Sequence, residues 1–157
     1  MNILGIAAGF HDAAATVISR DGEILFAGHS ERYSKRKNDA DLCLPLIQDA
    51  IAHGGAVDHV AYYERPWLKQ LRQLYSGQGI EWNKLSARRI INDQLRHKIQ
   101  LPARISTHNH HLSHAAGGFQ TSPFNRATVV VIDAIGEFDT VTTVSYTHLT
   151  LPTILRV

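Results

Sequence analysis

Apolar residues in the first part of the chain form short runs that predict three strands. The run NILGIAAG ends in small residues and has the length of a buried strand. The stretch AAATVISRDGEILFAGHSE then holds two runs of strand-forming residues on either side of Arg20-Asp21-Gly22. Asp-Gly between two apolar runs favours a tight hairpin. We therefore expect three opening strands, the second and third joined by a tight turn.

Helical periods alternate with strands in the middle of the chain. Over Leu42–His53 the apolar residues recur at helical spacing, and Gly54-Gly55 ends that helix. The segment VDHVAYY predicts a short strand. Two further helices are predicted, over Trp67–Tyr75 and from about Lys84 to Ile99, because basic and apolar residues alternate there with a helical period.

The last part of the chain predicts a strand, a helix and a hairpin. A strand entering a loop is predicted for ARISTHN, and a helix that ends near its glycine pair is predicted for HHLSHAAGGF. A further strand is predicted for ATVVVIDAIGE, with TVTTVSY as its hairpin partner. The fold class is therefore α/β, with a mixed sheet that opens with three strands and is flanked by helices. The chain has no internal repeat and no linker, so one module is expected. It ends inside the second hairpin, and residues 147–157 have no usable period, which indicates the front part of a larger domain with a tail of doubtful origin.

Composition and charge narrow the class of protein. The chain has 157 residues, 44% of them hydrophobic and 19% charged, with a net charge of +2. This balance indicates neither a nucleic acid nor a membrane surface as partner. The one cysteine, Cys43, excludes an internal disulfide and suits a reducing compartment. Asp12 comes too early for a signal peptide, and no apolar run approaches the roughly 18 residues of a membrane span. We expect a cytoplasmic globular protein whose oligomeric state the sequence leaves open.

Four histidines lie within residues 108–114 and offer a metal site. On a helix His110 and His114 are one turn apart on the same face, where two imidazoles can bind one ion. Asp133, after the apolar run VVVI, offers a carboxylate at a strand end, where open α/β sheets place their ligands. Two histidines and one carboxylate with open positions suit iron(II) or zinc. His108 and His111 point elsewhere on the helix, so we expect them near the metal ligands or in solvent. A surface location for the whole cluster is the alternative.

The turn after the first strand, GFHDAAA, offers a second group of polar side chains. Its glycine and small residues let a ligand approach the backbone closely. His11 can accept a proton near neutral pH, and Asp12 can orient it or a substrate hydroxyl. The alternative is a capped turn in which Asp12 binds only backbone N–H groups.

Two further segments can bind anions. The basic run from Glu31 to Lys37, which includes Arg32 and Lys35, can bind a phosphate or carbamoyl oxygen, or form a solvated loop. The turn after Asp133 contains Gly136 and Glu137. A glycine in this turn can expose N–H groups to a phosphate, or it can simply turn the chain. No GxxxxGK[ST] or GxGxxG motif is present, so these two routes to nucleotide binding are not supported.

Three blocks of the sequence resemble one protein family. ILGIAAGFHDAAATVISRDGEILFAGHSERYSKRKND is similar to the start of the O-carbamoyltransferases that act in nodulation and antibiotic tailoring. HHLSHAAGGFQTSPF and VVVIDAIGE are similar to the metal-binding helix and the following strand of that family. The blocks occur in the family's order and cover roughly residues 2–146. The resemblance implies that residues 1–146 are a truncated actin-like ATPase (ribonuclease H-like) domain.

The resemblance also implies a reaction. In such enzymes a C-terminal YrdC-like domain makes carbamoyl-adenylate from carbamoyl phosphate and ATP. The N-terminal domain passes the carbamoyl group to a hydroxyl of a small-molecule substrate, and an iron-type ion holds the adenylate phosphate. By position, the resemblance implies that His110, His114 and Asp133 are the metal ligands. It implies that His11 lies near the acceptor hydroxyl and that Lys35 lies in the basic run near the carbamoyl-adenylate. Gly136 and Glu137 correspond to the turn near the nucleotide.

This chain also departs from the family pattern. The family's further aspartate ligand and its YrdC-like domain lie outside these residues, and Ala134 stands where glycine is common. The resemblance stops after about Tyr146. We expect this chain alone to be inactive and to be insoluble or molten, because half of such a domain leaves an apolar sheet face or edge uncovered. The alternatives are a threonylcarbamoyl-type tRNA-modifying protein and a non-catalytic actin-like binding module.

Overall fold

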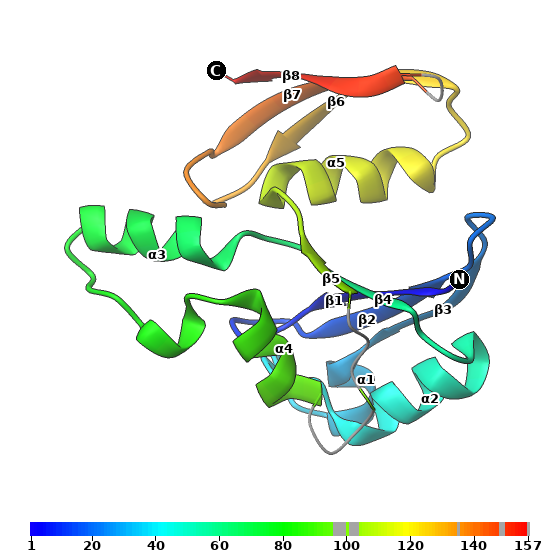
Figure 1. Cartoon of the computed structure of the whole chain (residues 1–157). Coiled ribbons are helices and arrows are strands. Elements are labelled where there is room, and N and C mark those ends of the chain that lie inside the picture. The colour runs from blue at the N-terminus through cyan, green and yellow to red at the C-terminus, as the bar shows by residue number, and fades with distance from the viewer. Residues whose placement is uncertain (96–99, 101–103, 135, 148–149, 157) are drawn as a thin grey trace. The chain divides into compact units, whose positions relative to one another are not determined.

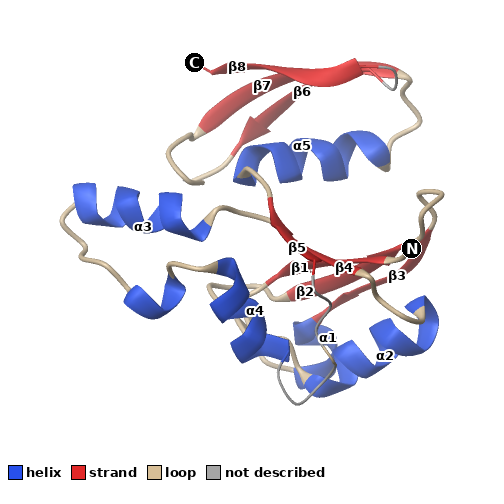
Figure 2. Cartoon of the chain, viewed as in Figure 1, coloured by secondary structure: helices blue, strands red, loops and turns tan. Residues whose placement is uncertain are grey.

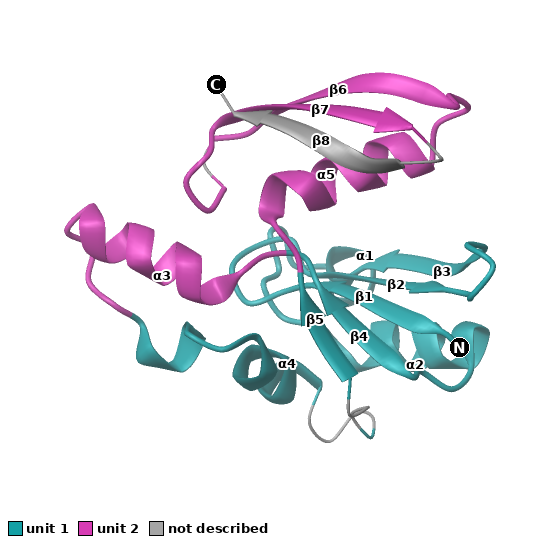
Figure 3. Ribbon diagram, turned by 45° about the horizontal axis from the view of Figure 1, so that its top comes forward, with its two compact units in different colours: residues 1–63, 81–107 teal, residues 64–80, 108–157 magenta. Residues whose placement is uncertain are grey.

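The computed structural model describes residues 1–95, 100, 104–134, 136–147 and 150–156, with only the backbone given for the last of these ranges. The contacts divide the chain into two compact units, Met1–Tyr63 with Glu81–Thr107 and Glu64–Ile80 with His108–Val157 (Figure 3). No composition shift or linker marks this division in the sequence.

A mixed five-stranded sheet forms the first unit (Figure 1). Its strands are β1 (Ile3–Ala7), β2 (Ala14–Ile18), β3 (Ile24–His29), β4 (His59–Tyr62) and β5 (Arg104–Thr107), in the order β3-β2-β1-β4-β5. The first three pair antiparallel, and β4 and β5 continue the sheet in parallel. The three opening strands and the α/β class expected from the sequence are thereby confirmed.

Alternation along the strands sets which side chains enter the core of this unit. In β1, Leu4 and Ile6 are buried while their neighbours are only partly covered, as the period of two along a strand requires. The turn between β2 and β3 is tight, as the Asp-Gly signal predicted. Its Gly22 has φ +86°, and the Gly22 N–H donates to the Ser19 carbonyl at 3.1 Å.

Three helices of the first unit lie on one side of the five-stranded sheet (Figure 2). They are α1 (Ser30–Ser34), α2 (Leu44–Gly54) and α4 (Ala87–Leu95), and a short 3₁₀ turn, η1 (Trp82–Lys84), precedes α4. Helix α2 buries Leu46, Ile47 and Ala50 against the sheet. At its end Gly55 has φ +66°, and its N–H donates to the Ile51 carbonyl at 2.8 Å. The glycine pair therefore ends the helix as predicted.

Two expectations for this unit differ from the structure. The helix expected over Lys84–Ile99 is divided: η1 ends at Lys84, and α4 begins after Ser86, whose carbonyl accepts the first helical N–H groups. Residues 96–99 lie outside the described residues. The basic run, expected as a strand-end loop, begins as helix α1, which closes at Lys35 with the Lys35 N–H on the Glu31 carbonyl at 3.0 Å.

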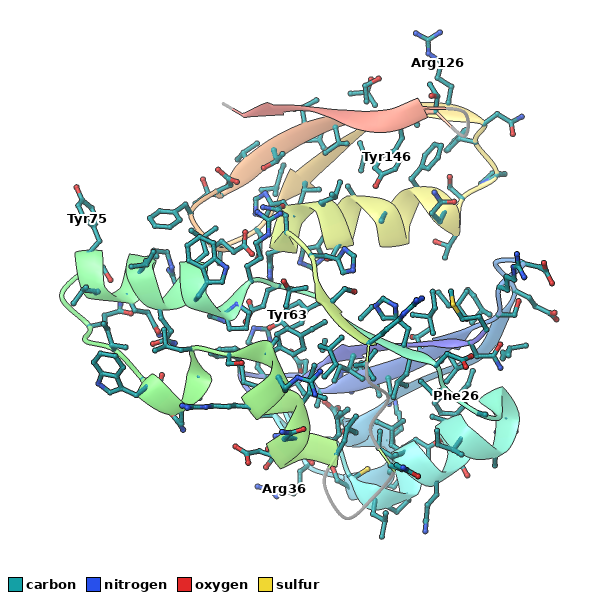
Figure 4. All side chains as sticks on the ribbon, viewed as in Figure 1. Phe26, Arg36, Tyr63, Tyr75, Arg126 and Tyr146 are labelled. Atoms are coloured by element: carbon teal, nitrogen blue, oxygen red, sulfur yellow. The ribbon has the colours of Figure 1, made fainter. Side chains whose placement is uncertain are left out.

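The second unit places a helix along one face of a three-stranded antiparallel sheet. It contains α3 (Pro66–Tyr75), α5 (His110–Gln120), β6 (Arg126–Ile132), β7 (Val141–Thr147) and β8 (Thr150–Arg156), and the strand order is β6-β7-β8. Phe119 of α5 stacks on Tyr146 of β7 with 4.8 Å between ring centroids, and Tyr146 points from the sheet toward α5 (Figure 4). Part of the tail expected to be of doubtful origin is strand β8; residues 148, 149 and 157 lie outside the described residues.

Strand β6 is less buried than its apolar sequence predicts. Val131 is buried against α5, but Val130 is 56% exposed and Ile132 is 78% exposed. The reason is that β6 is an edge strand of the described sheet, and α5 covers only one of its faces. The burial that the apolar run VVVI predicts for this strand was therefore wrong, since Val131 is its one buried residue.

Helix α3 also leaves apolar side chains exposed. Trp67, Leu71 and Leu74 lie about half exposed along it, and Tyr75 points away from its end (Figure 4). None of the helices in the described ranges combines the length and the apolarity that crossing a membrane requires.

The contact between Gly54 and Val17 generates a stability prediction. A Cβ at Gly54 would lie 2.4 Å from Val17 Cγ1, so Gly54→Ala should lower the free energy of unfolding of the purified protein by about 1–3 kcal/mol. A matched control is Gly117→Ala in α5, where an added Cβ meets nothing within 4 Å and should add about 0.5–1 kcal/mol. Urea unfolding measures both. Equal stability of Gly54→Ala and wild type would contradict the packing described.

Candidate metal centre

Helix α5 begins at the first histidine of the predicted pair. Asn109 caps it: the Asn109 side chain accepts the Leu112 N–H at 2.9 Å, and the Asn109 main-chain carbonyl accepts the Ser113 hydroxyl at 3.0 Å. This cap fixes His110 as the first helical residue and His114 one turn later. The Nε2 atoms of the two imidazoles lie 3.1 Å apart. The sequence spacing therefore brings the two rings together, as expected.

Asp133 reaches the same point from strand β6. The Asp133 N–H donates to the Thr140 carbonyl at 2.9 Å, and Asp133 Oδ1 accepts the Ala134 N–H at 2.7 Å. These bonds leave Oδ2 directed at the histidines, 2.8 Å from His110 Nε2 and 3.8 Å from His114 Nε2. One donor atom from each of the three side chains lies within 4.8 Å of the others. Two imidazole nitrogens and one carboxylate oxygen are a donor set that suits iron(II) or zinc.

The charges around this cluster favour a cation. Burial lowers the pKa of His110, but the carboxylates of Glu64 and Asp133 raise it by more, so it lies above its usual value. Burial and the neighbouring His110 hold the pKa of His114 below its usual value. Burial raises the pKa of Asp133, but the His110 hydrogen bond and the Ala134 N–H lower it by more. Positive charge is thus stabilised between two carboxylates.

Glu64 is a residue of this cluster that the sequence analysis missed. It is 1% exposed, and its Oε2 lies 3.5 Å from His110 Nδ1. Lys69 Nζ lies 3.3 Å from both of its carboxylate oxygens. A sequence signal existed, because Glu64 directly follows the apolar run VAYY just as Asp133 follows VVVI. A carboxylate at the end of an apolar run rarely serves packing.

Gly136 and Glu137 support the helix that carries the histidines. A Cβ at Gly136 would lie 3.0 Å from Cδ2 of both His110 and His111, so only glycine lets this turn lie against the two rings. Glu137 is buried and accepts the Arg65 N–H at 2.6 Å and the Asn109 side-chain N–H at 2.9 Å. Burial raises the pKa of Glu137. Their expected contact with a nucleotide stays a prediction.

The other two histidines of the cluster differ from the pair. His108 is exposed and precedes the helix cap. His111 is 1% exposed, and its Nδ1 contacts the hydroxyl of Thr142 on β7. It is therefore a core side chain, whereas the sequence analysis expected a position near the metal or in solvent.

The predicted His-Asp turn lies in the first unit. His11 Nδ1 is 3.1 Å from Asp12 Oδ2, and the His11 side chain is 73% exposed. Asp12 has φ 49°, in the left-handed region. The turn is held by the loop from 38 to 41: the Gly9 N–H donates to the Ala40 carbonyl at 2.8 Å, and the Ala13 N–H donates to the Asp39 carbonyl at 2.7 Å.

Of the predicted basic residues, Arg32 lies on α1 and Lys35 directly follows this helix, near the same end of this sheet. The Ser30 N–H donates to the Ala13 carbonyl at 2.7 Å, so α1 begins beside the residue that follows the His11–Asp12 turn. Lys35 closes the helix with φ 58°. This conformation costs a non-glycine residue about 1–2 kcal/mol. Lys35 therefore occupies a position that favours glycine.

Comparison with known proteins identifies the family. The family model described as Carbamoyltransferase N-terminus matches residues 69–150, which include His110, His114 and Asp133. The uncharacterized protein sll1178 of Synechocystis is 30% identical over 162 residues, covering 88% of this chain and 26% of that protein. Nodulation protein NolNO of Sinorhizobium fredii is 31% identical over 138 residues, covering 82% of this chain and 20% of that protein.

The chain spans about a quarter and a fifth of the lengths of these two relatives. The matched model covers more than half of the chain and includes the helix and strand that form the histidine–aspartate cluster. The family resemblance read from the sequence motifs is thereby confirmed. The chain belongs to the carbamoyltransferase family, within the N-terminal region of its members.

Proposed function

We propose that this chain is the N-terminal part of an ATP-dependent O-carbamoyltransferase. The enzyme moves a carbamoyl group from carbamoyl-adenylate, made from carbamoyl phosphate and ATP, to a hydroxyl of a small-molecule substrate. The observation that carries the proposal is the convergence of His110, His114 and Asp133 in a chain of this family. The net charge of +2 gives no support to the tRNA-modifying alternative.

The proposal includes an actin-like fold of the ribonuclease H-like type for this region, and the sheet of the first unit supports it. Its sheet opens with three antiparallel strands and continues with two parallel strands, in the order β3-β2-β1-β4-β5. In open α/β folds of this kind the ligand sites lie at the ends of the strands. The His11–Asp12 turn after β1 and helix α1 after β3 supply polar groups there.

In this proposal Nε2 of His110, Nε2 of His114 and Oδ2 of Asp133 hold an iron(II)-type ion. Such an ion, when bound, acts as a Lewis acid that neutralises the phosphate of the departing adenylate. The three side chains contribute by directing the lone pairs of these donor atoms toward one point. The convergence of the three donor atoms and the turn at Gly136 support this assignment.

His11 is the proposed base for the acceptor hydroxyl. The hydroxyl oxygen forms a bond to the carbamoyl carbon, the bond from that carbon to the adenylate phosphate oxygen breaks, and the hydroxyl proton passes to His11 Nε2. Asp12, 3.1 Å from His11 Nδ1, orients the ring so that Nε2 is available as acceptor. Arg32 and Lys35 supply positive charge for the carbamoyl-adenylate.

The metal assignment predicts how iron content depends on single histidines. His110→Ala and His114→Ala each remove one of the three donor atoms, so iron per protein after anaerobic reconstitution and gel filtration should fall at least about tenfold. The matched control is His108→Ala, an exposed histidine just before the same helix, which should keep wild-type iron. Elemental analysis measures all three variants. Unchanged iron in both ligand variants would refute the site.

The role of His11 predicts a specific loss of turnover. In a full-length carbamoyltransferase that contains this region, His11→Ala should lower kcat for carbamoyl transfer by about 10²–10⁴-fold, because it removes the proposed base. Its side chain is mostly exposed, so the unfolding temperature should hardly change. His53→Ala, at an exposed histidine of α2, is the control and should keep wild-type kcat. A His11→Ala enzyme with undiminished turnover would exclude His11 as the base.

Lys35 predicts opposite effects on stability and activity. Lys35→Gly relieves the left-handed conformation at the end of α1 and should raise the free energy of unfolding by about 1 kcal/mol. It also removes the proposed charge near the carbamoyl-adenylate, so in the full-length enzyme the KM for carbamoyl phosphate should rise. Denaturation and initial-rate measurements on one protein preparation test both effects. A variant that is more stable and fully active would show that Lys35 has no part in binding.

A further inference from the structure

We infer that Glu64 is a positioning residue that holds the His110 ring, through Nδ1, in the orientation that presents Nε2 to a divalent metal ion. This inference rests on the proposed function of the histidine–aspartate cluster. Glu64 Oε2 lies 3.5 Å from His110 Nδ1, while Asp133 Oδ2 lies 2.8 Å from His110 Nε2. The two carboxylates therefore face the two nitrogens of one ring.

The geometry assigns Glu64 a supporting role and not that of a ligand. The two nitrogens of an imidazole point in widely different directions, so an ion at His110 Nε2 cannot be reached by a carboxylate that faces Nδ1. The three converging donors come from His110, His114 and Asp133, and Glu64 is outside that group. A carboxylate that accepts the second N–H of a ligating histidine is the usual outer partner of a metal site.

Because Glu64 is buried, its carboxylate needs polar or charged partners. A carboxylate that is 1% exposed must have charged or N–H partners. Lys69 provides one, with Nζ 3.3 Å from both oxygens, and the His110 ring provides another. Pro66 begins α3 just after Glu64, with Arg65 as the cap, and the Arg65 N–H is held by Glu137 at 2.6 Å. The backbone on both sides of the contact is thus anchored.

The consequence for the metal is a favoured state of the His110 ring. An ion at Nε2 takes the place of the proton shared with Asp133 and leaves the remaining ring proton on Nδ1, which faces Glu64. The turn at Gly136 lies against Cδ2 of the same ring and limits its rotation. Glu64→Ala removes the carboxylate that faces Nδ1, so the metal-bound state of the ring is less favoured.

The test compares three variants of the purified protein by iron(II) affinity, measured anaerobically against a competing chelator. Glu64→Ala should weaken iron(II) binding by about 10–100-fold. Glu64→Gln keeps a polar oxygen at the position that faces Nδ1 and should lose less. Glu81→Ala, at an exposed glutamate that pairs with Lys84, is the control and should bind iron(II) as wild type does.

A second readout separates positioning from mere stability. Proton NMR of the protein loaded with zinc, which is diamagnetic, should show a His110 Nδ1 proton that exchanges slowly with water in wild type and Glu64→Gln, and quickly in Glu64→Ala. If Glu64→Ala does not fold, an iron(II) affinity of Glu64→Gln equal to wild type together with a rapidly exchanging His110 Nδ1 proton in zinc-loaded wild type overturns the inference. Wild-type affinity in a folded Glu64→Ala overturns it directly.

The iron(II) affinity of His110→Ala distinguishes a failure of the Glu64 inference from a failure of the proposed metal site. If His110→Ala retains iron(II), the site is not where we propose and the proposed function loses its support. If His110→Ala loses iron(II) while both Glu64 variants bind normally, the metal site stands and only the role of Glu64 is refuted.

Discussion

The candidate site depends on the packing of helix α5 against strand β6. Ala115 and Phe119 of the helix and Val131 of the strand are buried in one cluster, and this contact sets the separation between the helix start and the strand end. At that separation His110 Nε2 and Asp133 Oδ2 are 2.8 Å apart. The apolar contacts of the helix therefore determine a polar geometry at its first turn.

Two layers of polar groups surround this point. The inner layer consists of the two imidazoles and Asp133, which offer their donor atoms toward one another. The outer layer holds them in place: Asn109 caps the helix, Glu137 ties that cap to the backbone at Arg65, and Glu64 faces the other side of His110. A metal site is only as precise as the residues that orient its ligands. The second unit therefore contains both a donor set and its support.

Much of the local structure follows from the sequence because it depends on near neighbours. Alternation in β1, the Asp-Gly turn and the spacing of His110 and His114 each need only a few adjacent residues. Asp133 was found because a carboxylate after VVVI has no packing role. Glu64 gave the same signal but was missed, since its partner is 46 positions away in the chain. The exposure of Ile132 and the core position of His111 depend on which elements cover them, which periodicity does not reveal.

The central claim is that His110, His114 and Asp133 bind an iron-type ion in a carbamoyltransferase. X-ray absorption at the iron edge of the purified, anaerobically reconstituted protein tests it most directly, because imidazole rings bound to iron give a characteristic outer scattering pattern. The account predicts iron with two imidazole nitrogens and oxygen as the remaining ligands. Iron bound without imidazole, or protein that retains no iron after reconstitution, would contradict it.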